Sequence, residues 1–174
     1  MPKKQLYKKL YFAVYQNYKK NNKTSEFDSE TYKDLCGLVC DEFETAGYIN
    51  DRRYAGDKAK YLKEYKKYGN GRIKEYLYQK GIASDIINEI LEDEFFSDED
   101  IELENMRSLL KKKYGESLDR LDISDRNAVQ KAIHLLLRNG YKYQDAKKAI
   151  EDIIENINTE NIENIENEDY EDGF

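Results

Sequence analysis

The 174-residue chain has no tryptophan, one proline, one histidine and two cysteines. So few prolines and only nine glycines leave few points of helix interruption, which is typical of a mostly helical protein. Cys36 and Cys40 are four residues apart, and a disulfide on one helical turn is geometrically awkward. Zinc would need further ligands, and the single histidine, His134, is far away in sequence. We expect both cysteines to be reduced, partly buried helix residues, and we expect no cofactor.

The chain also lacks a long apolar run. Its first 20 residues, MPKKQLYKKLYFAVYQNYKK, have basic flanks but not the sustained hydrophobic core of a signal peptide or membrane span. Hydrophobic residues make up 39% and charged residues 37% of the sequence, which is at the polar end of globular proteins. Each folding unit has little apolar surface to bury, which favours an extended array of small bundles over one large core. We expect a soluble, cytoplasmic protein without membrane contact.

Apolar residues recur at intervals of three and four along most of the chain, the spacing of one helix face. Two helices are predicted before Gly47, and the second carries Leu35, Val39 and Phe43 on one stripe. Glycines mark the ends of predicted helices, because a residue without Cβ easily adopts the left-handed cap conformation. Three of the predicted helices have a serine at the expected N-cap position: Ser29, Ser84 and Ser124.

Three short helices joined by tight turns are predicted within residues 49–95, the pattern of a three-helix bundle. A second such unit follows at residues 96–155, and a shortened or degenerate N-terminal unit occupies residues 1–48. Aligning Gly81 with Gly140 brings out a weak internal repeat between the two complete units. The sequence therefore predicts an all-α fold of tandem three-helix repeats.

The last segment, residues 156–174, differs in composition from everything before it. It contains acids and asparagines with an Ile-Glu-Asn cadence, and it has no basic residue. Such a composition predicts a disordered acidic tail. The alternative is that Ile157 and Ile162 extend the last helix by a turn or two.

Charge is unevenly distributed along the chain, whose formal net charge is −7. Between Asn50 and Lys80 ten basic residues face four acids, a balance of +6, whereas residues 86–104 contain acids and no Lys or Arg. Such segregation indicates contact with a partner rather than a requirement of the fold. The ten residues, here named the basic strip, are Arg52, Arg53, Lys58, Lys60, Lys63, Lys66, Lys67, Arg72, Lys74 and Lys80.

Tyrosines interleave with the basic strip and could stack on exposed nucleic-acid bases: Tyr61, Tyr65, Tyr68, Tyr76 and Tyr78. An ordinary half-buried or solvated helix position explains any single one of these residues better. The strip as a whole favours binding. The acidic segments should repel free nucleic acid, so affinity for bare DNA is expected to be weak and salt-sensitive.

No catalytic constellation is visible in the sequence. The glycine-containing GNGR at residues 69–72 lacks the Gly-Lys-Ser/Thr ending of a phosphate-binding loop. His134 lies among apolar residues without a partner motif, so a core or rim histidine explains it better than a catalytic one. Acidic pairs such as Asp98 with Asp100 lack the pattern of a calcium loop. The sequence therefore predicts a binding protein and not an enzyme.

The run GYINDRRYA, followed by YGNGRIKEYLYQKGI and a short Ile-rich helix, resembles the RecX family of regulatory proteins over roughly Gly47 to Asp93. The resemblance rests on the order of a Gly-hydrophobe-hydrophobe-x-Asp turn, an Arg/Tyr-Ala helix, a glycine-led helix and a Lys-Gly-Ile step. It continues through LLLRNGYKYQDAKKAI, whereas the loop at residues 21–30 and the acidic tail depart from the family pattern.

The resemblance implies an elongated, curved array of three-helix repeats that binds the RecA recombinase filament on single-stranded DNA. It further implies inhibition of the recombinase and of its ATP hydrolysis, and damping of recombination and the SOS response, which places the protein in DNA repair. Single-stranded DNA would be contacted only indirectly or weakly, and we expect a monomer. Matching the family's motif positions gives eight candidate contact residues: Asp51, Arg52, Arg53, Tyr54, Lys58, Arg72, Lys74 and Lys80.

Two alternatives remain open. Asp51 is explained better as a helix cap than as a contact residue. The chain could also be a general helical nucleic-acid-binding or adaptor protein without specificity for RecA.

Overall fold

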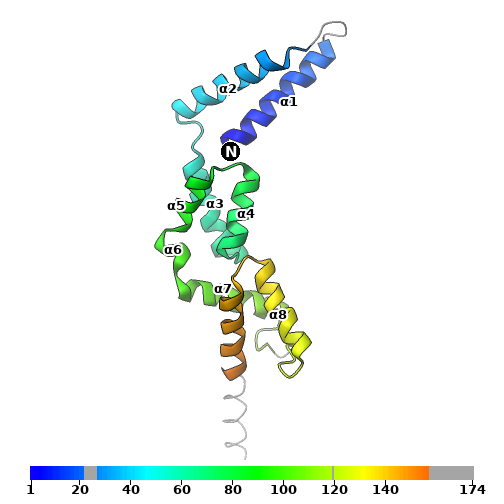
Figure 1. The fold of residues 1–174 in the computed structure, drawn as a ribbon, viewed down its shortest axis with the longest axis vertical. Helices are drawn as coiled ribbons and strands as arrows, with labels where there is room; N and C mark the ends of the chain where they lie inside the picture. The colour runs from blue at the N-terminus through cyan, green and yellow to red at the C-terminus, as the bar shows by residue number, and fades with distance from the viewer. Residues whose placement is uncertain (22–26, 119, 157–174) are drawn as a thin grey trace, which may run out of the picture. The chain divides into compact units, whose positions relative to one another are not determined.

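The computed structural model describes residues 1–21, 27–118 and 120–156, and every regular element within them is an α-helix (Figure 1). A further helix covers residues 143–156. The other helices are α1 (Lys3–Asn21), α2 (Ser29–Thr45), α3 (Asp51–Lys66), α4 (Asn70–Lys80), α5 (Ser84–Leu91), α6 (Glu94–Ser97), α7 (Glu99–Tyr114) and α8 (Arg126–Arg138).

The predicted all-α class is therefore confirmed for the described residues. No helix among them combines the length and the apolar character needed to cross a bilayer. The elongated, curved arrangement stays a prediction. The predicted acidic tail lies outside the described residues, apart from its first residue.

The chain divides into two compact units, and α3 and α4 contribute to both. The first unit combines Met1–Tyr61 with Lys74–Asp93, and the second combines Leu62–Ile73 with Glu94–Phe174. These units do not coincide with the repeats expected from the sequence. The division of the chain into repeats at residues 48, 95 and 155 stays a prediction.

In the first unit, α1 and α2 pack side by side as a helical hairpin (Figure 1). No residue of α1 is fully buried, and α2 buries only Cys36 and Cys40. Both cysteines are free, as predicted, and their burial is more complete than expected. One end of the hairpin is filled by mutually packed aromatic rings, namely Tyr11, Tyr15, Tyr18, Phe27 and Tyr32.

The apolar stripe predicted for α2 does not face the hairpin core. Leu35 is 50% exposed, Val39 36% and Phe43 44%, so these side chains lie outside the hairpin core. The adjacent stripe of Cys36 and Cys40 faces inward instead. A free cysteine behaves as a small hydrophobic side chain, which suits these two buried positions.

Two of the predicted serine caps are replaced by aspartates. Asp28 accepts bonds from N–H groups at the start of α2 at 3.2 Å, and Asp125 accepts one at 2.8 Å at the start of α8. An ionised carboxylate is a stronger acceptor for these N–H groups than a hydroxyl. Helix α5 begins after Ala83 with no side-chain cap. The predicted caps are therefore wrong, each by one position: Ser29, Ser84 and Ser124.

The remaining helices of the first unit present small and branched side chains to its core. Residues of α3, α4, α5 and the preceding loops are buried there: Ile49, Ala55, Ala59, Leu77, Ile82 and Ile87. Asn50 caps α3, because its Oδ1 accepts a hydrogen bond from the backbone N–H of Arg53 at 2.8 Å. Helix α4 ends at Lys80, and Gly81 follows it with φ of +88°.

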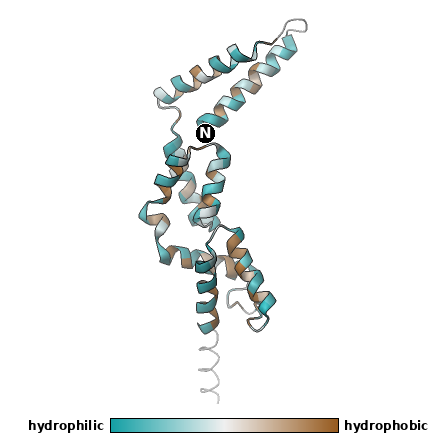
Figure 2. Cartoon of the chain, in the orientation of Figure 1, coloured by the Kyte–Doolittle hydropathy of each residue, from teal (hydrophilic) through white to brown (hydrophobic). Residues whose placement is uncertain are grey.

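The second unit contains the larger hydrophobic core, formed by α7, α8 and the helix at residues 143–156. Figure 2 shows hydrophobic residues recurring along α8, whereas α1 is largely hydrophilic. The core includes Met106, Leu110, Ile133, Leu136 and Ile150, each at most 4% exposed.

Glycines allow the start of α4 to touch the turn after α8 within the second unit. The backbone N–H of Gly69 donates to the carbonyl of Asn139 at 2.8 Å, and that of Gly71 donates to Gly140 at 3.1 Å. A Cβ on Gly69 would lie 2.6 Å from the Gly140 oxygen, and a Cβ on Gly140 would lie 2.1 Å from the backbone nitrogen of Arg72. We name these two hydrogen bonds the main-chain joint.

Candidate partner-binding surface on helices α3 and α4

The first unit brings lysines and tyrosine rings of α3 and α4 together. The Nζ of Lys58 lies 4.3 Å from the ring centroid of Tyr61 and 5.6 Å from that of Tyr76. The Nζ of Lys80 lies 5.1 Å from the Tyr76 centroid. These distances fall within the range of cation–π attraction, about 6 Å. We name Lys58, Tyr61, Tyr76 and Lys80 the lysine–tyrosine cluster.

Tyr54 adjoins this cluster from α3. Burial raises the pKa of its hydroxyl, and proximity and a hydrogen bond to Tyr76 raise that pKa further. Tyr54 therefore stays neutral at physiological pH and adds no phenolate charge beside the lysines. Tyr54, Lys58 and Lys80, three of the candidate contacts, are thus gathered around one tyrosine ring.

Side chains of α5 bind two residues of the basic strip, one through an ion pair and one through a hydrogen bond. Arg52 forms an ion pair with Glu89, and the Nζ of Lys74 donates to the Oδ1 of Asn88 at 3.1 Å. Arg53 is held more loosely: its side chain is 82% exposed, and its Nε lies 3.9 Å from the carboxylate four positions on. Sequence reasoning missed the α5 partners because only tertiary contact joins segments so far apart. A molecule that binds the first unit would therefore reach the side chain of Arg53 more easily than that of Arg52, which is already paired with Glu89.

Asp51 is occupied by a structural contact. Its Oδ1 accepts the backbone N–H of Lys3, the first residue of α1, at 2.8 Å. The Nζ of Lys3 pairs with Asp41 and Glu44, each at 2.7 Å. Asp51 thus satisfies one of the unpaired N–H groups at the start of α1. It acts as a cap, but for a helix other than its own.

Arg72 is the one predicted contact that lies in the second unit. It is exposed, and its guanidinium carbon lies 5.5 Å from the ring centroid of Tyr68. Arginine over an aromatic face presents a flat cationic surface suited to bases, carboxylates and phosphates.

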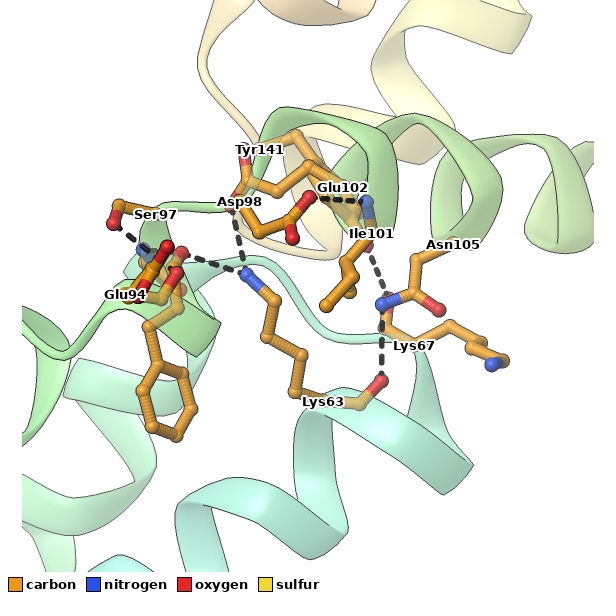
Figure 3. Close-up of polar contacts among 11 residues, drawn as sticks. Lys63, Lys67, Glu94, Ser97, Asp98, Ile101, Glu102, Asn105 and Tyr141 are labelled. Atoms are coloured by element: carbon orange, nitrogen blue, oxygen red, sulfur yellow. Dashed lines mark hydrogen bonds and ion pairs between the residues drawn. The ribbon is translucent and has the colours of Figure 1, made fainter.

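Lys63 is not part of the surface, so its place in the basic strip was wrong. Its side chain is 1% exposed, and its Nζ donates to the carbonyl of Phe96 at 2.7 Å (Figure 3). The same Nζ pairs with Glu102 at 3.3 Å, and Asn105 donates to the Lys63 carbonyl at 3.2 Å. Burial lowers the pKa of Lys63, and the Glu102 carboxylate opposes that shift. Lys63 is therefore an internal link between α3 and the segment of α6 and α7.

His134 lies exposed on α8, outside the core. Within the described residues no group of three or more His, Cys, Asp or Glu side chains is placed to hold a metal ion. The best-defined chemical feature of α3 and α4 is the lysine–tyrosine cluster.

Comparison with known proteins identifies the segment that carries this cluster. A family model described as the RecX second three-helix domain matches residues 50–91. The chain is a relative of the RecX regulatory proteins. The matched RecX segment contains α3, α4 and α5, and with them the whole lysine–tyrosine cluster.

Three curated proteins named Regulatory protein RecX are similar to the chain. That of Clostridioides difficile (strain 630) is 29% identical over 136 residues, covering 78% of this chain and 59% of the relative. That of Streptococcus sanguinis (strain SK36) is 30% identical over 131 residues, covering 69% and 43%. That of Streptococcus pneumoniae serotype 19F (strain G54) is 29% identical over 138 residues, covering 74% and 46%.

The resemblance to the RecX family is thus confirmed, and the chain spans about half the length of the relatives it matches. No solved structure matches the chain.

Proposed function

We propose that this protein is a non-enzymatic, cytoplasmic regulator that binds the RecA filament on single-stranded DNA. Its binding inhibits ATP hydrolysis and strand exchange and so damps recombination and the SOS response. The observation that supports this proposal is the lysine–tyrosine cluster within the segment matched by the RecX second domain.

The lysine–tyrosine cluster is suited to a partner that carries both acidic groups and aromatic rings. Lys58 and Lys80 can neutralise phosphates or the carboxylates of a protein partner. Tyr61 is 41% exposed, so it presents ring surface to solvent. Base–aromatic stacking tolerates any sequence, as a regulator acting along a filament requires.

The surrounding charge favours a nucleoprotein over bare nucleic acid. The chain has a formal net charge of −7, and the acidic α5 lies beside the basic residues of α3 and α4. Bare DNA is repelled by such acids, whereas a protein partner can supply basic groups to meet them. DNA contact is therefore weak or indirect in this proposal.

The test is RecA-catalysed ATP hydrolysis on single-stranded DNA, titrated with this protein. Lys58→Glu with Lys80→Glu should raise the concentration for half-inhibition by about 10-fold or more, because two attractive charges become repulsive. The matched control is Lys142→Glu with Lys148→Glu, two exposed lysines of the second unit with the same change in net charge.

Equal inhibition by a folded Lys58/Lys80 variant and the wild type would reject this surface. Wild-type protein that leaves RecA untouched but binds single-stranded DNA in a salt-sensitive manner would favour the general nucleic-acid-binding protein instead.

A further inference from the structure

Helix α2 carries an apolar face that the described residues leave open to solvent. Leu35 is 50% exposed, Leu38 60%, Val39 36% and Phe43 44%. Their spacing of three and four residues places them on one side of the helix. We name these four residues the α2 apolar face. A contiguous apolar face of this kind is a common mark of a protein–protein contact.

The α2 apolar face is separate from the side of α2 that packs on α1. Helical geometry places it roughly a quarter turn away from the buried Cys36 and Cys40. In a four-helix bundle each helix packs against two neighbours through adjacent faces. Helix α2 thus packs against α1 within the hairpin, and its apolar face can pack against a second helix.

The hairpin also has too little core of its own. Helix α1 buries no residue fully, and α2 buries only its two cysteines. Polar helices of this length depend on tertiary packing for most of their stability. A further layer packed on the hairpin would supply the missing core.

Charge indicates which molecule supplies that layer. Helix α1 has six lysines and no acid, whereas α2 has five acids and one lysine. Within one hairpin, Lys3 pairs with Asp41 and Glu44. A second copy of the chain can place its lysine-rich α1 beside the acid-rich α2 of the first copy, and the reverse pairing follows by twofold symmetry.

We propose that two copies of this chain associate through their α1–α2 hairpins to form a four-helix bundle. The α2 apolar face of each copy packs between the copies, and α1 of one copy lies against α2 of the other. This proposal replaces the expectation of a monomer, and it does not depend on the proposed action on RecA.

Sedimentation of the full chain over a range of concentrations tests the apolar contact. The wild type should sediment as a dimer, and Leu35→Ser with Leu38→Ser should weaken dimerisation at least tenfold. The matched control is Tyr78→Ser with Tyr143→Ser, which removes apolar side chains that are 68% and 52% exposed elsewhere. It should remain a dimer. Wild-type protein that stays monomeric at every concentration would overturn the proposal.

A charge swap tests the pairing even if the serine variant loses its helices. Lys8→Glu, Lys9→Glu, Lys19→Glu and Lys20→Glu change the net charge of α1 from +6 to −2. Glu30→Lys, Asp34→Lys and Glu42→Lys change the net charge of α2 from −4 to +2. Asp41 is kept because it pairs with Lys3. Each variant alone should be monomeric, and an equimolar mixture should form a heterodimer in which both α1–α2 contacts are attractive. A mixture that remains monomeric, or variants that dimerise alone, would exclude this pairing of helices.

Discussion

At the scale of single residues, the largest difference between sequence and structure concerns Lys63. In the sequence it is one lysine among ten basic residues, and its polar neighbours give no sign of burial. Its partners, Phe96 and Glu102, lie 33 and 39 residues further along the chain. Contacts over such separations cannot be read from helical periodicity, and the ion pair of Arg52 with Glu89 was missed for the same reason.

Replacing Lys63 by alanine should strongly destabilise the second unit. The substitution removes the donor to the Phe96 carbonyl and leaves Glu102 without its partner in a largely buried site. Breaking a buried pair in this way costs about 3 kcal/mol or more in the free energy of unfolding. Urea denaturation measures the loss, and the exposed Lys60→Ala on the same helix is the control. Equal midpoints for the two variants would contradict the internal role of Lys63.

Tyr141 should make stability fall at alkaline pH. Its hydroxyl donates to the carbonyl of Lys67 at 2.9 Å, and burial, with Glu102 nearby, raises its pKa. Above about pH 10 the unfolded chain loses the phenolic proton while the folded chain keeps it, so unfolding is favoured as pH rises. The contribution approaches about 1.4 kcal/mol per pH unit.

Tyr141→Phe lacks this titration, so its free energy of unfolding should fall less steeply than that of the wild type in alkaline buffers. At neutral pH the variant should be about 1 kcal/mol less stable, because the hydrogen bond is lost. The lowered pKa of Lys63 acts in the opposite direction but is common to both proteins and cancels in the difference. Parallel alkaline curves for wild type and variant would count against a buried, neutral Tyr141. Tyr143→Phe, at a tyrosine that is 52% exposed, is the control.

At the scale of helices, the sequence predicted which segments are helical better than which side each helix buries. The helical segments can be predicted from periodicity and from the positions of glycines. Gly47, Gly81 and Gly140 all adopt positive φ near helix ends. The inward side of α2 could not be read from the sequence, because the stripe of Leu35, Val39 and Phe43 lies next to the one of Cys36 and Cys40, and only the second is buried. The sequence showed Lys58 and Lys80 as members of the basic strip, with Tyr61 and Tyr76 between them. It could not show that the four side chains form one cluster, because that depends on how α3 packs against α4.

Two glycine substitutions should change stability in opposite directions. Gly140→Ala places a Cβ 2.1 Å from the backbone nitrogen of Arg72, at a residue with φ of +91°. The clash and the backbone strain together should cost about 3 kcal/mol or more. Gly56→Ala lies within α3, has no atom within 4 Å of the added Cβ, and should stabilise by about 0.5–1 kcal/mol. Thermal unfolding compares them, and a shift of the same sign for both would contradict the assigned geometry.

At the scale of the whole molecule, charge determines what the protein can bind and how salt affects that binding. The chain is acidic overall, while residues 50–80 carry ten basic residues against four acids. The sequence predicted this segregation directly, because charge can be counted without knowledge of the fold. It could not show how many of those charges are already neutralised within the folded chain.

Binding to bare single-stranded DNA should be weak and should decrease steeply with salt. If about four basic residues neutralise phosphates, log K falls with log salt at a slope of about −3, or roughly 50-fold between 50 and 200 mM salt. Fluorescence anisotropy with a labelled oligonucleotide measures this slope. A salt-independent affinity would show that the basic residues of α3 and α4 do not contact phosphates.

Unlike binding through charged side chains, the main-chain joint does not depend on salt concentration or on the protonation of side chains. It is made of peptide N–H and carbonyl groups held at close range by glycines, so neither added electrolyte nor protonation of a side chain weakens it. Salt concentrations that weaken the proposed binding at the lysine–tyrosine cluster should therefore leave the main-chain joint formed. If the proposed binding is correct, release of the target and its rebinding do not require the main-chain joint to break.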